Sequence, residues 1–442
     1  MSDPSLVSAL IGRRQFLRGS AALAAGAHVM TPGAWGSLQA SKVSKRRPTL
    51  VLIFLRGGCD GLHLVVPYGD PDYARRRRGL AVPGPDQPGG VLAIDETFGL
   101  HPAAGALAPL FQRGLAAAVH AVGHPENTRS HFEEQDRWEL ASPSDEIGAA
   151  GWLGRYLKAT AEGAPGPIRA VALGQAVPRS LRGPVSTLAI HRLAELRVLG
   201  EAKGLDATMA ALRRAYGKNR DREAASGGGK QGAEKSRARE LLRRDGEATL
   251  DAMRQLSEVA AKPFEAKGAY PSGDLGDRLR EAARLVDSGL GLEVIQIDHG
   301  GFDTHQSQAN SWAGLVTPLA QGLAAFFADI ETRGRANDVL VLAVSEFGRT
   351  VRMNGTRGTD HGSAGCVLAL GGAVRGEEGR PAKGVLGEWP TLAREALQDD
   401  RDLRMTTDIR DVYAEALGRF MGVPEAANVL PGWKPSPLGL FG

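Results

Sequence analysis

Five short, largely apolar runs constrain the fold of this 442-residue chain more than any other feature of its sequence. Most of them lack the alternation of apolar and polar residues that is typical of a half-exposed strand. This indicates strands that are buried on both faces of a sheet. Such a sheet needs helices on both sides, so the runs predict an α/β fold. The runs are residues 50–55, 116–122, 293–298, 339–344 and 366–370.

A helical stripe between the third and fourth runs indicates how these strands are connected. Leu319, Leu323, Phe326, Phe327 and Ile330 recur at the spacing of one helix face. A strand, a helix and a strand with short loops between them form a βαβ unit, in which the two strands are parallel. We therefore predict a mostly parallel central sheet with helices on both faces.

The middle of the chain has a different composition. Residues 218–245 hold nine Lys or Arg and five Asp or Glu around three consecutive glycines, which predicts a solvated loop or a disordered insert. The segments on either side look helical, so we interpret residues 190–290 as a mostly helical insertion into the sheet. A run of ordinary sheet-covering helices is the alternative.

The first forty residues have the order of an export signal. Arg13 and Arg14 precede Phe16 and Leu17, and an Ala-rich apolar run and several small residues follow. We expect 1–40 to be a twin-arginine signal peptide, with the start of a basic amphipathic helix as the alternative. The twin-arginine export machinery would then deliver residues 41–442 to the periplasm or the cell exterior. No later apolar run suggests a membrane span in this mature chain.

Charge and cysteine content exclude several classes of protein. The chain has 54 basic and 50 acidic side chains, which is too balanced for a protein that binds nucleic acid through a basic surface. Two cysteines are too few for a disulfide scaffold or a Cys-rich zinc site. Cys59 and Cys366 could pair after export, although buried free cysteine is the commoner state.

Polar clusters lie at the ends of four of the predicted strands. Ligands of open α/β sheets gather beyond the carboxyl ends of the strands, and carboxylates and imidazoles from separate loops can build a metal site there. A single Asp after a strand is more often a helix cap, but several clusters together favour a site. The residues concerned are Asp60, Asp303, His305, Glu346, Arg349, Asp360 and His361.

A further cluster follows the second predicted strand. Ser130 and Glu133 have the spacing of a capping box, which predicts the start of a helix. The free amides of a helix start also attract anions, so Arg129 could clamp an anion beside Ser130. The cap and the anion site are compatible readings of the same residues.

The order of these motifs resembles the bacterial domain-of-unknown-function family 1501, over about residues 48–440. That family is similar to the alkaline phosphatase and sulfatase superfamily, so the resemblance implies an alkaline phosphatase-like α/β fold. The motifs are the twin arginines, Phe54-Leu55-Arg56-Gly57-Gly58-Cys59-Asp60-Gly61-Leu62, Arg129-Ser130-His131-Phe132, Gly301-Phe302-Asp303-Thr304-His305, Ser345-Glu346-Phe347-Gly348-Arg349-Thr350 and Asp360-His361-Gly362.

The resemblance implies a site of one or two divalent metal ions that holds a phosphate or sulfate ester. By position, Asp303, His305 and His361 match the ligands of one metal. Asp60 and Glu346 match ligands of the other, whose oxygen donors favour Mg²⁺, Ca²⁺ or Mn²⁺, whereas the first site suits Zn²⁺ or Mn²⁺.

Some assignments within this set stay open. Ser130, or less readily Thr128, falls where the nucleophile would be. Asp360 either orients His361 or binds metal directly. Arg349 either clamps an anion or forms a salt bridge. Phe347 replaces a metal-binding His of the superfamily and puts the second metal in doubt.

These observations predict an exported, metal-dependent hydrolase of phosphate or sulfate esters, acting on a small molecule or a polysaccharide. In this hypothesis Ser130 or water attacks, and Arg129 or Arg349 balances the developing charge. The alternative is a non-catalytic metal- or glycan-binding envelope protein on a degenerate fold. A weaker third hypothesis is a scaffold that captures another secreted protein through the charged segment.

Overall fold

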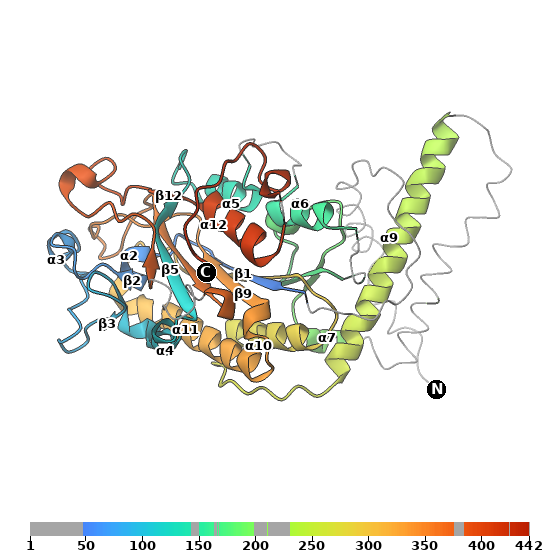
Figure 1. Ribbon diagram of the computed structural model, residues 1–442, viewed down its shortest axis with the longest axis horizontal. Coiled ribbons are helices and arrows are strands. Elements are labelled where there is room, and N and C mark those ends of the chain that lie inside the picture. Colours follow the sequence, from blue (N-terminus) through green and yellow to red (C-terminus); the bar gives the residue numbers. More distant parts are fainter. Residues whose placement is uncertain are drawn as a thin grey trace.

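The structure is a computed structural model that describes residues 47–142, 150–162, 166, 168–198, 210, 230–374, 384–423 and 425–441 (Figure 1). The predicted signal peptide, 1–40, and the first part of the charged segment, 218–229, lie outside the described residues.

In the described chain, nine strands form one central sheet with the order β11-β5-β10-β9-β1-β8-β6-β7 and with β12 beside β5. All five predicted runs are strands of this sheet. A separate three-stranded sheet has the order β2-β4-β3. The central strands are β1 (Thr49–Leu55), β5 (Ala116–Gly123), β6 (Ala170–Leu173), β7 (Leu188–Ile190), β8 (Val294–His299), β9 (Val339–Val344), β10 (Gly365–Leu370), β11 (Val385–Leu386) and β12 (Thr407–Asp408), and the small ones are β2 (Val65–Val66), β3 (Leu92–Ala93) and β4 (Gly99–Leu100).

The central sheet is mostly parallel, as predicted. Strand β1 pairs in parallel with β8 and β9, and β6 pairs in parallel with β7 and β8. Strand β10 is the exception, because it runs antiparallel to both β5 and β9. Its first residue therefore lies at the edge of the sheet where β1, β5, β8 and β9 end.

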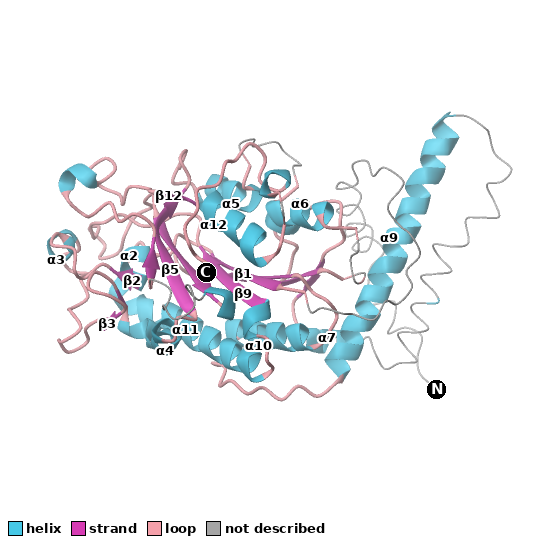
Figure 2. Ribbon diagram, viewed as in Figure 1, coloured by secondary structure: helices cyan, strands magenta, loops and turns pink. Residues whose placement is uncertain are grey.

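Helices cover both faces of the sheet (Figure 2). Side chains of β1 alternate between two cores: Val51 and Ile53 pack on one face, and Leu52 and Phe54 on the other. The first face is covered by α4 (Ala108–Gln112), α10 (Asp274–Asp287) and α11 (Gln308–Thr332), and the second by α5 (His131–Leu140), α6 (Trp152–Ala159) and α12 (Ile409–Glu415). The remaining α-helices of the described residues are α2 (Gly61–Leu64), α3 (Tyr73–Arg76), α7 (Leu193–Val198) and α9 (Lys230–Ala261).

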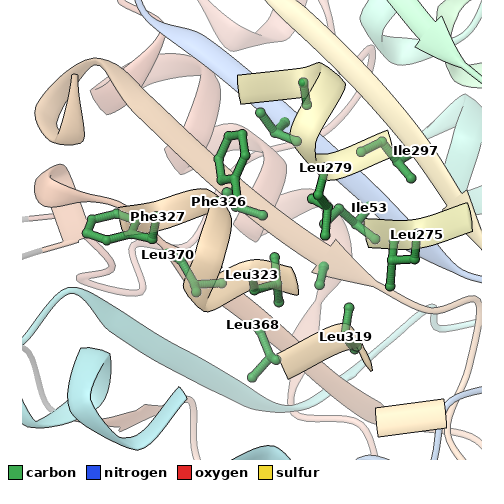
Figure 3. Close-up of a cluster of buried hydrophobic side chains, with 14 of the residues drawn as sticks. Ile53, Leu275, Leu279, Ile297, Leu319, Leu323, Phe326, Phe327, Leu368 and Leu370 are labelled. Atoms are coloured by element: carbon green, nitrogen blue, oxygen red, sulfur yellow. The ribbon is translucent and has the colours of Figure 1, made fainter. Parts of the chain in front are cut away.

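The predicted stripe of α11 is buried in the core that the sheet shares with α10 and α11 (Figure 3). Leu319, Leu323 and Phe326 of α11 lie beside Leu279 of α10 and Ile53 of β1. By length and composition, α11 is also the one helix of the described chain that could cross a membrane. Its apolar side chains are part of the main core, which is the position of a core helix in a globular protein.

The structure corrects the prediction of a loop across residues 218–245. Residues 230–245 belong to α9, a 32-residue helix. Alternating charges at helical spacing support a solvated helix as well as a loop, and the sequence pattern did not separate the two. The C-terminal half of α9 joins the core through Leu256 and Val259, and its other end extends away from the sheet (Figure 1).

Helix α10 lies within the predicted insertion at 190–290, and it packs directly over the sheet with α11. This position matches the alternative of a sheet-covering helix for that segment. The domain boundaries themselves stay a prediction.

Candidate metal centre

Three imidazoles and one carboxylate meet at the edge of the sheet where β1, β5, β8 and β9 end. Asp303 Oδ1 lies 2.9 Å from His305 Nε2, 3.2 Å from His361 Nε2 and 3.4 Å from His131 Nε2. The two nitrogens His305 Nε2 and His361 Nε2 are 2.9 Å apart. Ligand atoms of His131, Asp303 and His361 lie within 4.8 Å of one another, and this is the one group of three potential metal ligands found in the described residues.

The sheet topology explains why residues so distant in sequence meet. Asp303 and His305 follow β8, and His131 begins α5 soon after β5. His361 precedes β10, and the reversed direction of that strand brings its start to the same edge. The loops pack closely there: Gly57 has a φ of +114°, and a Cβ at this position would lie 2.5 Å from the backbone nitrogen of Asp303.

Each of the three histidines has its other ring nitrogen held by an oxygen. His131 Nδ1 donates to Glu346 Oε1 over 2.7 Å, and His361 Nδ1 donates to the backbone oxygen of Arg129 over 2.8 Å. His305 Nδ1 donates to Asp360 Oδ1 over 3.1 Å. Because these bonds place the proton on Nδ1, each Nε2 keeps a lone pair, and this is the usual arrangement of histidines that bind metal.

The donor set therefore fits a divalent metal ion. His131 Nε2 is buried and makes no hydrogen bond among the described residues, although it faces Asp303. A buried polar atom without a hydrogen-bond partner is costly unless a ligand satisfies it.

The contacts of two carboxyl groups in and beside the centre explain why their pKa values are lowered. Burial raises the pKa of Asp303, but Arg349 and the neighbouring histidines outweigh it and bring this pKa down to about 2. Burial also raises the pKa of Glu346, and hydrogen bonds from His131 and Gln135 lower it to about 2. Both carboxyl groups are thus anionic at neutral pH.

Arg349 is an ion-pair partner within the centre. Its Nη2 lies 2.5 Å from Asp303 Oδ1 and also donates to the backbone oxygens of Gly57 and Phe302, while Nε and Nη1 donate to those of Gly58 and Thr359. The side chain is fully buried. Of the two readings offered by the sequence, the structure shows the salt bridge, and the guanidinium holds three loops together around Asp303.

Arg129 and Ser130 lie beside the centre. The Arg129 guanidinium binds Asp399 and Asp402, while its backbone oxygen holds His361. Ser130 is the N-cap of α5, as predicted, but its side chain makes no capping hydrogen bond, so the capping box is wrong. Glu134 takes a related role instead, because it accepts hydrogen bonds from the amide and hydroxyl of Thr128.

The two carboxylates predicted for a second metal each bind protein donors. Asp60 is fully buried, pairs with Arg77 Nη2 over 2.5 Å and accepts from Gln308 Nε2 over 2.7 Å. Glu346 Oε1 accepts from His131, Gln135 and the amide of Gly57. Glu346 therefore reaches the centre through His131, and Asp60 is absent from the group of ligand atoms.

Asp360 also reaches the centre through a histidine, because Oδ1 binds His305 Nδ1 and the side-chain amide of Asn354. The sequence offered Asp360 as a partner of His361 or as a ligand, and the partner observed is His305. Phe347 is buried, with its ring centroid 4.8 Å from that of His131 and 5.0 Å from that of His361. It forms an apolar wall beside these two imidazoles.

Sequence reasoning missed His131. The residue was noticed only as part of the Ser130 cluster, since nothing in its local spacing indicates a ligand. The sequence feature that could have indicated a ligand is the position of this histidine in the first turn of a helix that follows a strand of the sheet.

Comparisons with known proteins agree with the motif order. A family model described as "Protein of unknown function (DUF1501)" matches residues 96–432. The chain belongs to this family. Asp303 and the three histidines around its Oδ1 lie within the DUF1501 match, whereas Asp60 precedes it.

Among solved structures, the chain is similar to the PsFucS1 sulfatase from Pseudoalteromonas sp., at 12% identity over 86% of this chain and 68% of that chain, with a TM-score of 0.34. It is also similar to Ps i-CgsB in complex with k-i-k-neocarrahexaose, at 10% identity over 87% and 74% of the two chains, with a TM-score of 0.36. A comparison with curated proteins found no match.

Proposed function

We propose that this chain is an exported, metal-dependent hydrolase of phosphate or sulfate esters. One observation carries the proposal: three imidazole Nε2 atoms surround Asp303 Oδ1, and each imidazole is oriented by an oxygen at its Nδ1. A purely structural polar cluster does not need three histidines in the same tautomer, whereas a metal centre does.

His131, Asp303 and His361 would hold the metal, with His305 as a further donor. Imidazole and carboxylate donors together suit Zn²⁺ or Mn²⁺ better than Mg²⁺ or Ca²⁺. When bound, such an ion supplies Lewis acidity to an ester oxygen. The pairing of Asp60 with Arg77 and of Glu346 with His131 supports one ion rather than two.

Ser130 is the nucleophile in this proposal. It immediately precedes His131 in the chain, and its hydroxyl is not used to cap α5. The first amides of α5 have no partner within the helix, so an ester oxygen placed there meets N–H donors and the favourable end of the helix dipole. The Arg129 and Arg349 side chains act indirectly, because their guanidinium groups bind carboxylates.

Metal analysis with paired histidine variants tests this proposal. We expect about one ion per chain in the protein purified after native export, and hydrolysis of 4-nitrophenyl phosphate or 4-nitrophenyl sulfate. His131→Ala should lose both, while His191→Ala, which changes a histidine outside the centre, should keep both. A wild-type protein without metal would refute the proposal.

A non-catalytic metal- or glycan-binding envelope protein is the second candidate. The observation that favours it is Phe347, whose ring lies beside His131 and His361 where the superfamily resemblance expects a metal-binding His. The two candidates differ in turnover. Stoichiometric metal without hydrolysis of any phosphate or sulfate ester would select the second.

A further inference from the structure

Four arginines line a surface cavity of about 570 Å³. We call it the arginine cavity. Its walls come from α3, the stretch after β9 and the segment that carries Asp400. The lining residues are Asp72, Arg75, Arg76, Arg352, Ala393, Arg394, Glu395 and Asp400.

The carboxylate of Asp400 forms ion pairs with three of these guanidinium groups. Asp400 lies 3.3 Å from Arg76 Nη1, 3.2 Å from Arg352 Nη2 and 3.1 Å from Arg394 Nε. Since each guanidinium has five N–H donors, a single carboxylate cannot use them all. The Nε of Arg76, whose side chain is only 7% exposed, is buried without a hydrogen-bond partner among the described residues.

The cavity keeps an excess of positive charge. Its lining has four arginines against three acidic residues, and Arg352 and Arg394 are 54% and 76% exposed. Planar guanidinium groups bind the oxygens of sulfate, phosphate and carboxylate in pairs. An oxyanion is therefore the class of ligand that these donors fit.

The backbone holds Asp400 in place. Asp399 and Asp400 have φ values of +57° and +52°, and the amide of Arg401 donates to the backbone oxygen of Gln398 over 3.1 Å. This tight turn directs Asp399 to Arg129 and Asp400 to the arginine cavity. The turn thus connects the cavity to the loop that precedes His131.

The cavity lies close to the metal centre along the chain. Arg349 pairs with Asp303 in the centre, and Arg352, three residues later, lines the cavity. Three residues span at most about 11 Å between their Cα atoms. The cavity and the centre are thus lined by neighbouring residues of the connection between β9 and β10.

We infer that the arginine cavity is a subsite for a second oxyanion group of a polymeric substrate whose reacting ester lies at the metal centre. This inference rests on the proposed function, and it narrows the substrate to a polymer that carries more than one oxyanion group. A sulfate ester and a phosphate ester share the required chemistry, and the cavity donors suit either group.

Calorimetric titration of the full chain with dextran sulfate, phosphorylated dextran and neutral dextran tests the inference. We expect one or both charged polymers to bind and neutral dextran not to bind. Arg352→Ala/Arg394→Ala should weaken binding at least about tenfold, because charge-assisted hydrogen bonds are lost. Arg113→Ala, which removes an exposed arginine paired with Glu331, is the matched control and should bind as the wild type does.

The double variant should retain its metal and its hydrolysis of a small 4-nitrophenyl ester. His131→Ala should still bind the charged polymer. Binding at the arginine cavity is therefore measured separately from metal content and hydrolysis, so a failure of the hydrolase proposal can be told apart from a failure of the subsite. Binding that is equal in the wild type and the double variant, or no binding of either charged polymer, would overturn the subsite and leave the cavity as a salt-bridge network that fixes the turn.

Discussion

Glu346 Oε1 accepts a hydrogen bond from His131 Nδ1 over 2.7 Å, and this contact joins the end of β9 to the start of α5. The carboxylate is fully buried, and it also receives the amide of Gly57 and the side-chain amide of Gln135. The bond fixes both the ring orientation and the tautomer of His131. Glu346 is therefore a positioning residue of the metal centre.

Glu346→Gln should weaken metal binding by about 10–100-fold, the usual effect of losing a partner of a metal-binding His. The substitution keeps the shape of the side chain and removes its charge. Competition with a chelator of known affinity measures the change. Glu133→Gln, at an exposed position of α5, the helix that begins at His131, is the control. An unchanged affinity would contradict the assigned role.

Removal of the metal should lower thermal stability. A ligand present at 100 times its Kd stabilises the folded state by about 2.7 kcal/mol, so a chelator should shift the unfolding temperature by several degrees. Asp303→Ala should melt at the same temperature with and without the chelator. If the chelator also shifts the melting of this variant, the ion is bound elsewhere.

Acid should destabilise the metal-free protein through Glu346. Its pKa of about 2 in the folded state lies below the ordinary value of 4.5, so the ionised form stabilises the fold at pH values above the ordinary pKa. This contribution should disappear as the pH falls from about 4.5 towards 2. Urea unfolding at pH 6, 4 and 3 measures it. The difference between wild type and Glu346→Gln should shrink with falling pH, and a constant difference would count against this account.

Arg77→Ala should destabilise the fold strongly, because it leaves Asp60 as an unpaired buried charge. The usual cost of breaking a buried ion pair is about 3–5 kcal/mol. Metal content per folded chain should not change, since Asp60 is not among the ligand atoms of the centre. Arg75→Ala is the matched control, because Arg75 lies in the same arginine run and is 70% exposed. Loss of metal in folded Arg77→Ala would restore Asp60 as a ligand.

The strands and the main core could be predicted from the sequence because their signal is local. Val339–Val344 is a strand with the bounds that its apolar run indicated, and the Leu319 stripe is buried as its spacing required. The same reasoning placed Asp303 and His305 at one sheet edge, since the carboxyl ends of parallel strands coincide. These predictions needed only the strand direction. His361 reaches this edge of the sheet only because β10 is reversed, which the sequence pattern did not indicate.

The partners of each side chain could not be predicted in the same way. His131 and Glu346 are 215 residues apart, and only the packing of α5 against the β9 loop brings them together. Asp60 follows β1 as a ligand would, yet Arg77 reaches it from a short helix that no sequence pattern connects to it. The charged composition of 230–245 likewise fits a helix and a loop equally well. Tertiary contacts decided the first two cases.

The reversed direction of β10 has a consequence for how this site can change over evolution. Because β9 ends and β10 begins at the same edge, residues 345–364 leave and re-enter the sheet without crossing it. This one connection supplies Glu346, Arg349, Asp360 and His361, as well as Arg352 of the arginine cavity. A single exchange of this segment would replace one histidine of the metal centre, the partners of the other ligands and the neighbouring anion contact together, while the sheet beneath stays the same.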